Sequence, residues 1–123
     1  MEHVRHQHVV VVAQPRYLAI AWKIRNVVQV EQMELVTALG VPAVRVTSPA
    51  GPAAILDATR VLEHNLAMPV GSVALQGKSY VVRHVLPLAA LTVARLDEVL
   101  EVIAHEAARI RHRDAVFLGR TAY

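Results

Sequence analysis

The 123-residue sequence contains no cysteine, which excludes disulfide bonds, thiolate metal sites and cysteine nucleophiles. Aromatic residues make up only 4% of the chain. No apolar run approaches the roughly 18 to 20 residues that a membrane-spanning helix requires. The first residues are polar, and no signal-peptide core follows them. These absences lead us to expect a cytoplasmic protein with no membrane partner.

The charge balance is weakly basic, with a net charge of +3 from 13 basic and 10 acidic residues. The arginines are scattered, and the one cluster, residues 109–113, lies where a helix is expected to end and cations are favourable. No aromatic residues alternate with this cluster, as single-stranded nucleic acids would require. We therefore expect no nucleic-acid partner.

Hydrophobic residues make up 54% of the chain, which predicts a folded domain, and the length suits a single domain over residues 1–123. Strand patterns come first and helical patterns follow. Strands are expected over His8–Gln14, Tyr17–Ile24, 41–47, 73–76 and 79–85, with 27–30 extending the second strand or opening another. Helices are expected over 32–39, 53–68 and 93–113, and a loop over 48–52. This order predicts an α+β fold with an antiparallel sheet and helices on one face.

Two of the expected helices carry an apolar stripe. In the helix over 53–68 the stripe includes Leu62 and Leu66, which leaves His64 on the solvent side. The last helix has apolar residues spaced alternately by four and three, at Leu96, Leu100, Ile103, Ala107 and Ile110. Val102 falls outside this stripe, so it is either an exposed valine or a partner contact.

No combination of residues predicts an active site. His3, His6 and His8 are close in sequence but do not share one strand face, so we expect no metal ion and no cofactor there. Ser72 and Ser79 have no neighbouring base and no nucleophile-elbow motif. We therefore expect no catalytic residue.

Asn65 is the most informative single residue, because its position places a polar amide on the apolar face of the helix over 53–68. A buried amide without a hydrogen bond costs roughly 1–3 kcal/mol. We expect Asn65 to bind the turn at 68–71, and a ligand contact is the alternative.

A longer pattern covers residues 62–91: a helix that ends in an asparagine, a Pro-x-Gly turn, a short hairpin, and a strand that ends Arg-x-x-Leu-Pro-Leu before a long last helix. The residues at these places are Asn65, Pro69, Gly71, Leu75, Arg83, Leu86, Pro87, Leu88 and Leu91. The order and spacing resemble the YbjN family and the related type III secretion chaperone-like (CesT, Tir-chaperone) domains. The resemblance covers about a third of the chain closely and residues 17–112 more loosely.

The resemblance implies a noncatalytic homodimer of secretion-chaperone-like fold that holds a segment of another protein. A sensory or regulatory protein of the same fold, which binds a small ligand or a signalling partner, is the alternative. Candidate structural or partner residues are Asn65, Pro69, Gly71, Arg83, Pro87 and Val102. The chain departs from the secretion chaperones at its start, where they have an amphipathic helix and residues 1–16 here predict a strand.

Overall fold

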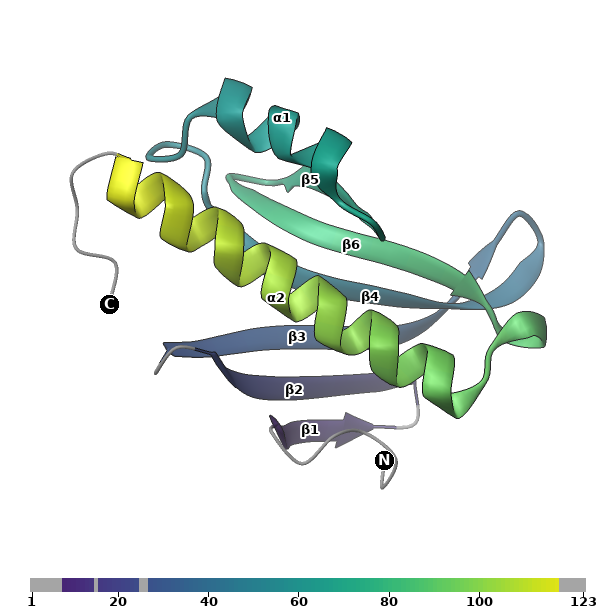
Figure 1. Cartoon of the computed structure of the whole chain (residues 1–123). Helices are drawn as coiled ribbons and strands as arrows, with labels where there is room; N and C mark the ends of the chain where they lie inside the picture. The colour runs from purple at the N-terminus through teal and green to yellow at the C-terminus, as the bar shows by residue number, and fades with distance from the viewer. Residues whose placement is uncertain (1–7, 15, 25–26, 118–123) are drawn as a thin grey trace.

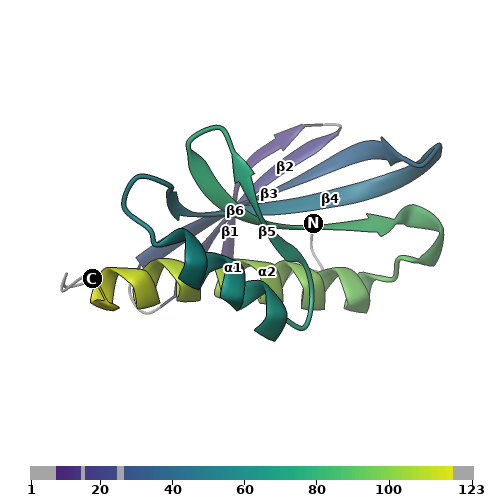
Figure 2. The same cartoon turned by 90° about the horizontal axis from the view of Figure 1, so that it is seen from above.

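Six antiparallel strands form one sheet, and two α-helices cover one of its faces in the computed structural model (Figures 1 and 2). The structure describes residues 8–14, 16–24 and 27–117, and for 8–14 and 113–117 it describes the backbone alone. The α+β fold with helices on one face, predicted from the sequence, is confirmed.

The elements run in the order strand, strand, strand, strand, helix, strand, strand, helix. They are β1 (His8–Gln14), β2 (Tyr17–Ile24), β3 (Val27–Ala38), β4 (Val41–Pro52), α1 (Ala58–Ala67), β5 (Ser72–Gln76), β6 (Ser79–Pro87), the 3₁₀ turn η1 (Leu88–Ala90) and α2 (Val93–Phe117). Their order across the sheet is β1-β2-β3-β4-β6-β5. After β4 the chain forms α1 and then the β5–β6 hairpin, in which β6 pairs with β4 and β5 lies at the edge of the sheet.

The helix predicted over residues 32–39 is wrong, because these residues form most of β3 and the turn after it. The strand pairs with β2 on one side and with β4 on the other, and these two rows of backbone hydrogen bonds outweigh a weak helical preference. The turn to β4 has two residues, Leu39 and Gly40, with φ of +52° and +78°. Positive φ at both positions is the requirement of a type I′ hairpin turn.

The loop predicted over residues 48–52 is also wrong. These residues extend β4 and pair with β6, across an irregularity between Pro49 and Gly51. The side chains of Ser48 and Ala50 are fully buried against the helical layer. A β-bulge accommodates the proline here, since the extra residue interrupts the regular ladder of hydrogen bonds.

The first helix is shorter than predicted and turned about its axis. It begins at Ala58, where the Asp57 carboxylate accepts a hydrogen bond from the backbone N–H of Thr59 at 3.1 Å. Leu62 and Leu66, predicted to be buried, are 56% and 92% exposed. His64, predicted to face solvent, is buried against α2 instead.

The second helix confirms the four-three stripe, because all five of its positions are buried, from Leu96 to Ile110. Val93, which the apolar pattern would add to this stripe at the start of the helix, is 48% exposed. Thr92 precedes the helix and caps it, because its hydroxyl accepts a hydrogen bond from the Arg95 N–H at 3.1 Å. Leu100 and Ile103 at the centre of the stripe are fully buried against the sheet. Each such side chain contributes about 1.5–3 kcal/mol through burial.

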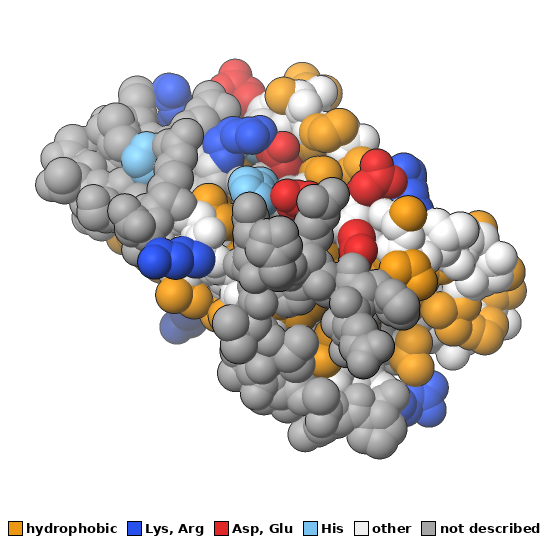
Figure 3. Space-filling view, turned by 60° about the horizontal axis from the view of Figure 1, so that its bottom comes forward, with side chains coloured by type: hydrophobic (Ala, Val, Ile, Leu, Met, Phe, Trp, Pro, Cys, Tyr) orange, Lys and Arg blue, Asp and Glu red, His pale blue; other side chains and the backbone are white. Residues whose placement is uncertain are grey.

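Hydrophobic side chains remain exposed at one end of the molecule, at the right of Figure 3, where η1 and the β3–β4 turn lie. Leu39, Val41 and Leu88 are exposed there. Charged side chains of both signs are interspersed over the rest of the described surface in this view (Figure 3). Within the described residues, neither helix has the length and apolarity to cross a membrane.

Candidate functional site

The face of the sheet opposite the helices carries a row of polar side chains. Strand alternation buries Val44 and Val46 under α2 and turns Arg45 to the other face. The strand register then places four residues side by side across β3, β4, β6 and β5: Gln32, Thr47, Arg83 and Ser72. Residues distant in the sequence therefore share one surface.

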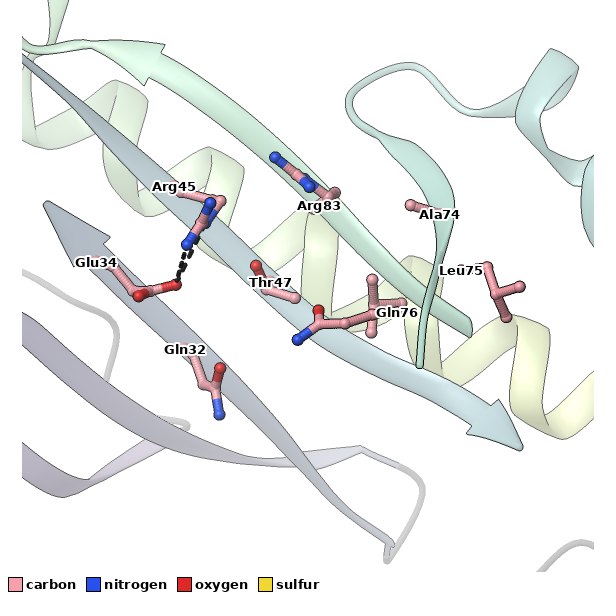
Figure 4. A pocket seen from close by; sticks show the side chains of 9 residues that line it. Gln32, Glu34, Arg45, Thr47, Ala74, Leu75, Gln76 and Arg83 are labelled. Atoms are coloured by element: carbon pink, nitrogen blue, oxygen red, sulfur yellow. Dashed lines mark hydrogen bonds and ion pairs between the residues drawn. The ribbon is translucent and has the colours of Figure 1, made fainter. Parts of the chain in front are cut away.

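A hollow of about 180 Å³ lies along this row (Figure 4). Its lining comes from β3, β4, β5 and β6, namely Gln32, Glu34, Arg45, Thr47, Ala74, Leu75, Gln76, Val81 and Arg83. On one side, Arg45 donates from Nε and Nη2 to Oε1 of Glu34, at 3.2 and 3.0 Å. This pair is partly exposed, so it orients the two side chains and adds little stability.

Arg83 is the other arginine of the hollow, and it is half-buried in the middle of the row. Among the described residues its guanidinium has no hydrogen bond or ion pair, in contrast to that of Arg45. A guanidinium is always charged and presents several N–H donors in a fixed plane, which suits a carboxylate. The hollow therefore offers an unused anion-binding group.

A second, more open hollow of about 460 Å³ adjoins the first at Arg83. It is lined by Gly71, Ser72, Ala74, Arg83, His84 and Val85. Gly71 has a φ of +82°, and a Cβ there would lie 2.9 Å from the carbonyl oxygen of Arg83 and 2.6 Å from Cδ1 of Ile103. Only glycine fits this close approach, which fixes where the chain enters β5.

The candidate residues taken from the sequence fall into three groups. Asn65 accepts a hydrogen bond from the backbone N–H of Val73 at 2.6 Å, so it ties the end of α1 to the strand just after the predicted turn. Gly71 and Arg83 meet at the start of β5, as described above. Pro69, Pro87 and Val102 take no part in either hollow: the prolines are exposed, and Val102 lies half-buried on α2.

The sequence did not indicate the β3 and β4 part of the hollow. Gln32 and Glu34 lie in the segment predicted as a helix, so their pairing with Thr47 and Arg45 could not be foreseen. The only usable signal was the alternation of Val44, Arg45 and Val46, which places Arg45 on the opposite face from the valines.

Polar side chains also lie between the sheet and α2. The indole Nε1 of Trp22 donates to Oε1 of Glu31 at 2.7 Å, and both side chains are fully buried. Oε2 of Glu31 is buried and has no hydrogen-bond partner among the described residues. Burial raises the pKa of Glu31 well above its usual value, and the hydrogen bond from Trp22 opposes this only in part.

A second buried group joins the two helices. Nε2 of His64 lies 2.7 Å from Oε1 of Glu106, and Nη1 of Arg109 donates to Oε2 of the same carboxylate at 2.8 Å. His64 and Glu106 are both buried, which fixes the rotation of α1 against α2. The hydrophobic pattern of α1 gave no signal for this pair, because residue 106 is 42 positions away.

The remaining histidines whose side chains the structure describes do not come together in one site. Burial, with a smaller contribution from the positive charge of Arg95, lowers the pKa of His84 below 6.5. The His105 ring packs edge-on against Trp22 at 6.3 Å between centroids. Over the described residues, no three histidine, aspartate or glutamate side chains lie close enough to hold a metal ion. His3 and His6 lie outside the described residues, as does the side chain of His8.

Comparison of the sequence with models of known protein families and with curated proteins gives no match.

Proposed function

We propose that this chain is a noncatalytic, chaperone-like protein-binding module of the cytoplasm that holds a segment of a partner protein on the helix-free face of its sheet. The observation that carries the proposal is the polar hollow around Arg83, whose guanidinium has no partner among the described residues. Polar groups that converge on a concave surface are typical of binding sites.

The arrangement of the second half of the chain supports the same proposal. Helix α1, the β5–β6 hairpin and the long helix α2 follow in the order that the resemblance to the secretion chaperone-like domains implies. Strand β1 stands where those chaperones have an amphipathic helix, so we propose the sheet itself as the binding surface, rather than an N-terminal helix.

A selection of random peptides tests the proposal. The affinity of peptides selected on the immobilised chain is then measured for two variants. Ala74→Trp fills the hollow, and Lys78→Trp adds the same ring in the exposed turn of the same hairpin. We expect Ala74→Trp to weaken binding at least about tenfold and Lys78→Trp to leave it unchanged. Equal binding to both variants, or no selected peptide at all, would contradict the proposal.

We also propose that the module is a homodimer that joins through α1. Leu62 and Leu66 are one helical turn apart and exposed, and such a stripe is commonly covered by a partner. Sedimentation velocity at micromolar concentration should give twice the 13.5 kDa mass of the chain. Leu66→Glu should produce a monomer, while Ala67→Glu, which adds the same charge beside the stripe, should leave the dimer intact. A monomeric wild-type chain would contradict this assembly.

A further inference from the structure

The two strands of the β5–β6 hairpin differ in length, which leaves part of β6 with a neighbour on one side only. The pairing of β5 with β6 runs from Gln76↔Ser79 to Ser72↔Arg83 and ends there. The pairing of β6 with β4 continues to Pro87. In Figure 1, β6 extends well past the point where β5 begins. Over residues 84–86, no described strand lies on the β5 side.

This open edge is a built feature of the fold. The chain enters β5 through Gly71, whose close approach to the Arg83 carbonyl and to Ile103 leaves no space for a side chain. The pairing with β6 ends at Ser72, and the preceding segment connects to α1, which lies off the sheet on the same side as α2 (Figure 2). In an antiparallel strand, the N–H and C=O groups of one residue point to one side of the strand, and those of the next residue point to the other side. Some backbone groups of residues 84–86 therefore point away from β4 and into the open hollow.

The charge beside this edge is positive. Arg83 lies at its start with no described partner, and Arg95 of α2 lies close enough to His84 to oppose its protonation. Glu34, the acidic side chain of the adjoining hollow, is already bound to Arg45. The edge is therefore complementary to an extended chain that carries a carboxylate.

We infer that an extended segment of the partner protein adds to the sheet as a strand beside β6 at residues 84–86 and places an acidic side chain against Arg83. The inference rests on the proposed function and specifies how the partner is held. Backbone pairing supplies affinity that is largely independent of sequence, and the arginine selects an acidic side chain. Pro87 has no N–H and ends the available edge.

The test uses a fluorescein-labelled Val-Glu-Val-Glu-Val-Glu-Val peptide with an amidated C-terminus, and fluorescence anisotropy with the full chain. Two further peptides isolate the two contributions: one has glutamine in place of glutamate, and one has every backbone nitrogen methylated. We expect Arg83→Ala to weaken binding of the acidic peptide about tenfold, Arg83→Lys to weaken it less, and Lys78→Ala to leave it unchanged. The methylated peptide should not bind. The affinity of the glutamine peptide for the wild-type chain should equal the affinity of the acidic peptide for Arg83→Ala.

Amide hydrogen exchange by NMR locates the peptide independently of the variants. Binding should slow exchange of at least one amide among residues 84–86 and leave that of Lys78 unchanged. The inference is overturned if the methylated peptide binds as tightly as its parent, or if free glutarate displaces the peptide at equal concentration, since either result shows a simple anion site. It is also overturned if the acidic peptide fails to bind while randomly selected peptides bind and are blocked by Ala74→Trp. In that last case the proposed function stands.

Discussion

Gly71 offers the sharpest test of the structure, because one added methyl group should meet a backbone oxygen and the end of a fully buried side chain. In Gly71→Ala the new Cβ would lie 2.6 Å from Cδ1 of Ile103 and 2.9 Å from the backbone oxygen of Arg83. Ile103 is fully buried, and the Arg83 carbonyl belongs to the backbone of β6, which is paired with β4 at this residue. A left-handed backbone costs alanine about 1–2 kcal/mol, and overpacking typically costs about 1–3 kcal/mol more. The free energy of unfolding should therefore fall by about 2–5 kcal/mol.

Gly77→Ala is the matched control. Its φ of +62° carries the same backbone penalty, but no atom lies within 4 Å of the added Cβ. Both variants also reduce the entropy of the unfolded chain to the same extent, so this contribution cancels in the comparison. Gly77→Ala should lose only about 1–2 kcal/mol, and the difference between the variants measures the close approach at Gly71.

Urea unfolding followed by the fluorescence of Trp22 is a suitable assay, since this is the one tryptophan of the chain and is fully buried. The two variants should differ in midpoint at an unchanged denaturant slope. Losses that agree within about 0.5 kcal/mol, which is the size of ordinary surface effects, would refute the packing of Gly71 described above.

Three further predictions concern Leu100, Glu31 and His84. Leu100→Ala should lose about 2–5 kcal/mol of stability and Glu101→Ala about 0.5 kcal/mol or less, and equal losses in urea melts would show that the wrong face of α2 is buried. Because burial raises the pKa of Glu31, the contribution of this residue to stability is most favourable below its usual pKa of 4.5 and is lost as the pH rises through the folded-state pKa. Glu31→Gln should remove this loss, so its stability relative to wild type should rise between pH 5 and 8; a constant difference would contradict the raised pKa. The lowered pKa of His84 has the opposite sign, with stability lost as the pH falls from 6.5 toward the folded-state pKa, so His84→Gln should flatten the decline in urea midpoint between pH 7 and 5.

The sequence by itself determined the elements whose hydrophobic period is unambiguous. Strand β2 and the two strands of the β5–β6 hairpin lie where β-favouring runs predicted them. The stripe around Leu100 and Ile103 predicted which face of α2 is buried, because four-three spacing places those side chains on one side of any helix. Asn65 forms a hydrogen bond at the end of α1 as expected, but its partner is Val73 of β5, two residues past the predicted turn.

Tertiary structure decided the features that depend on distant partners. Residues 32–38 form a strand because β2 and β4 pair with both of their edges, an interaction with no local trace in the sequence. The rotation of α1 follows from the contact of His64 with Glu106. This buried contact outweighs the free-energy cost of leaving Leu62 and Leu66 exposed to water. The polar hollow has the same origin: Gln32, Thr47 and Arg83 become neighbours only through the register of three strands, since one residue of slip in any of them would turn its side chains to the other face.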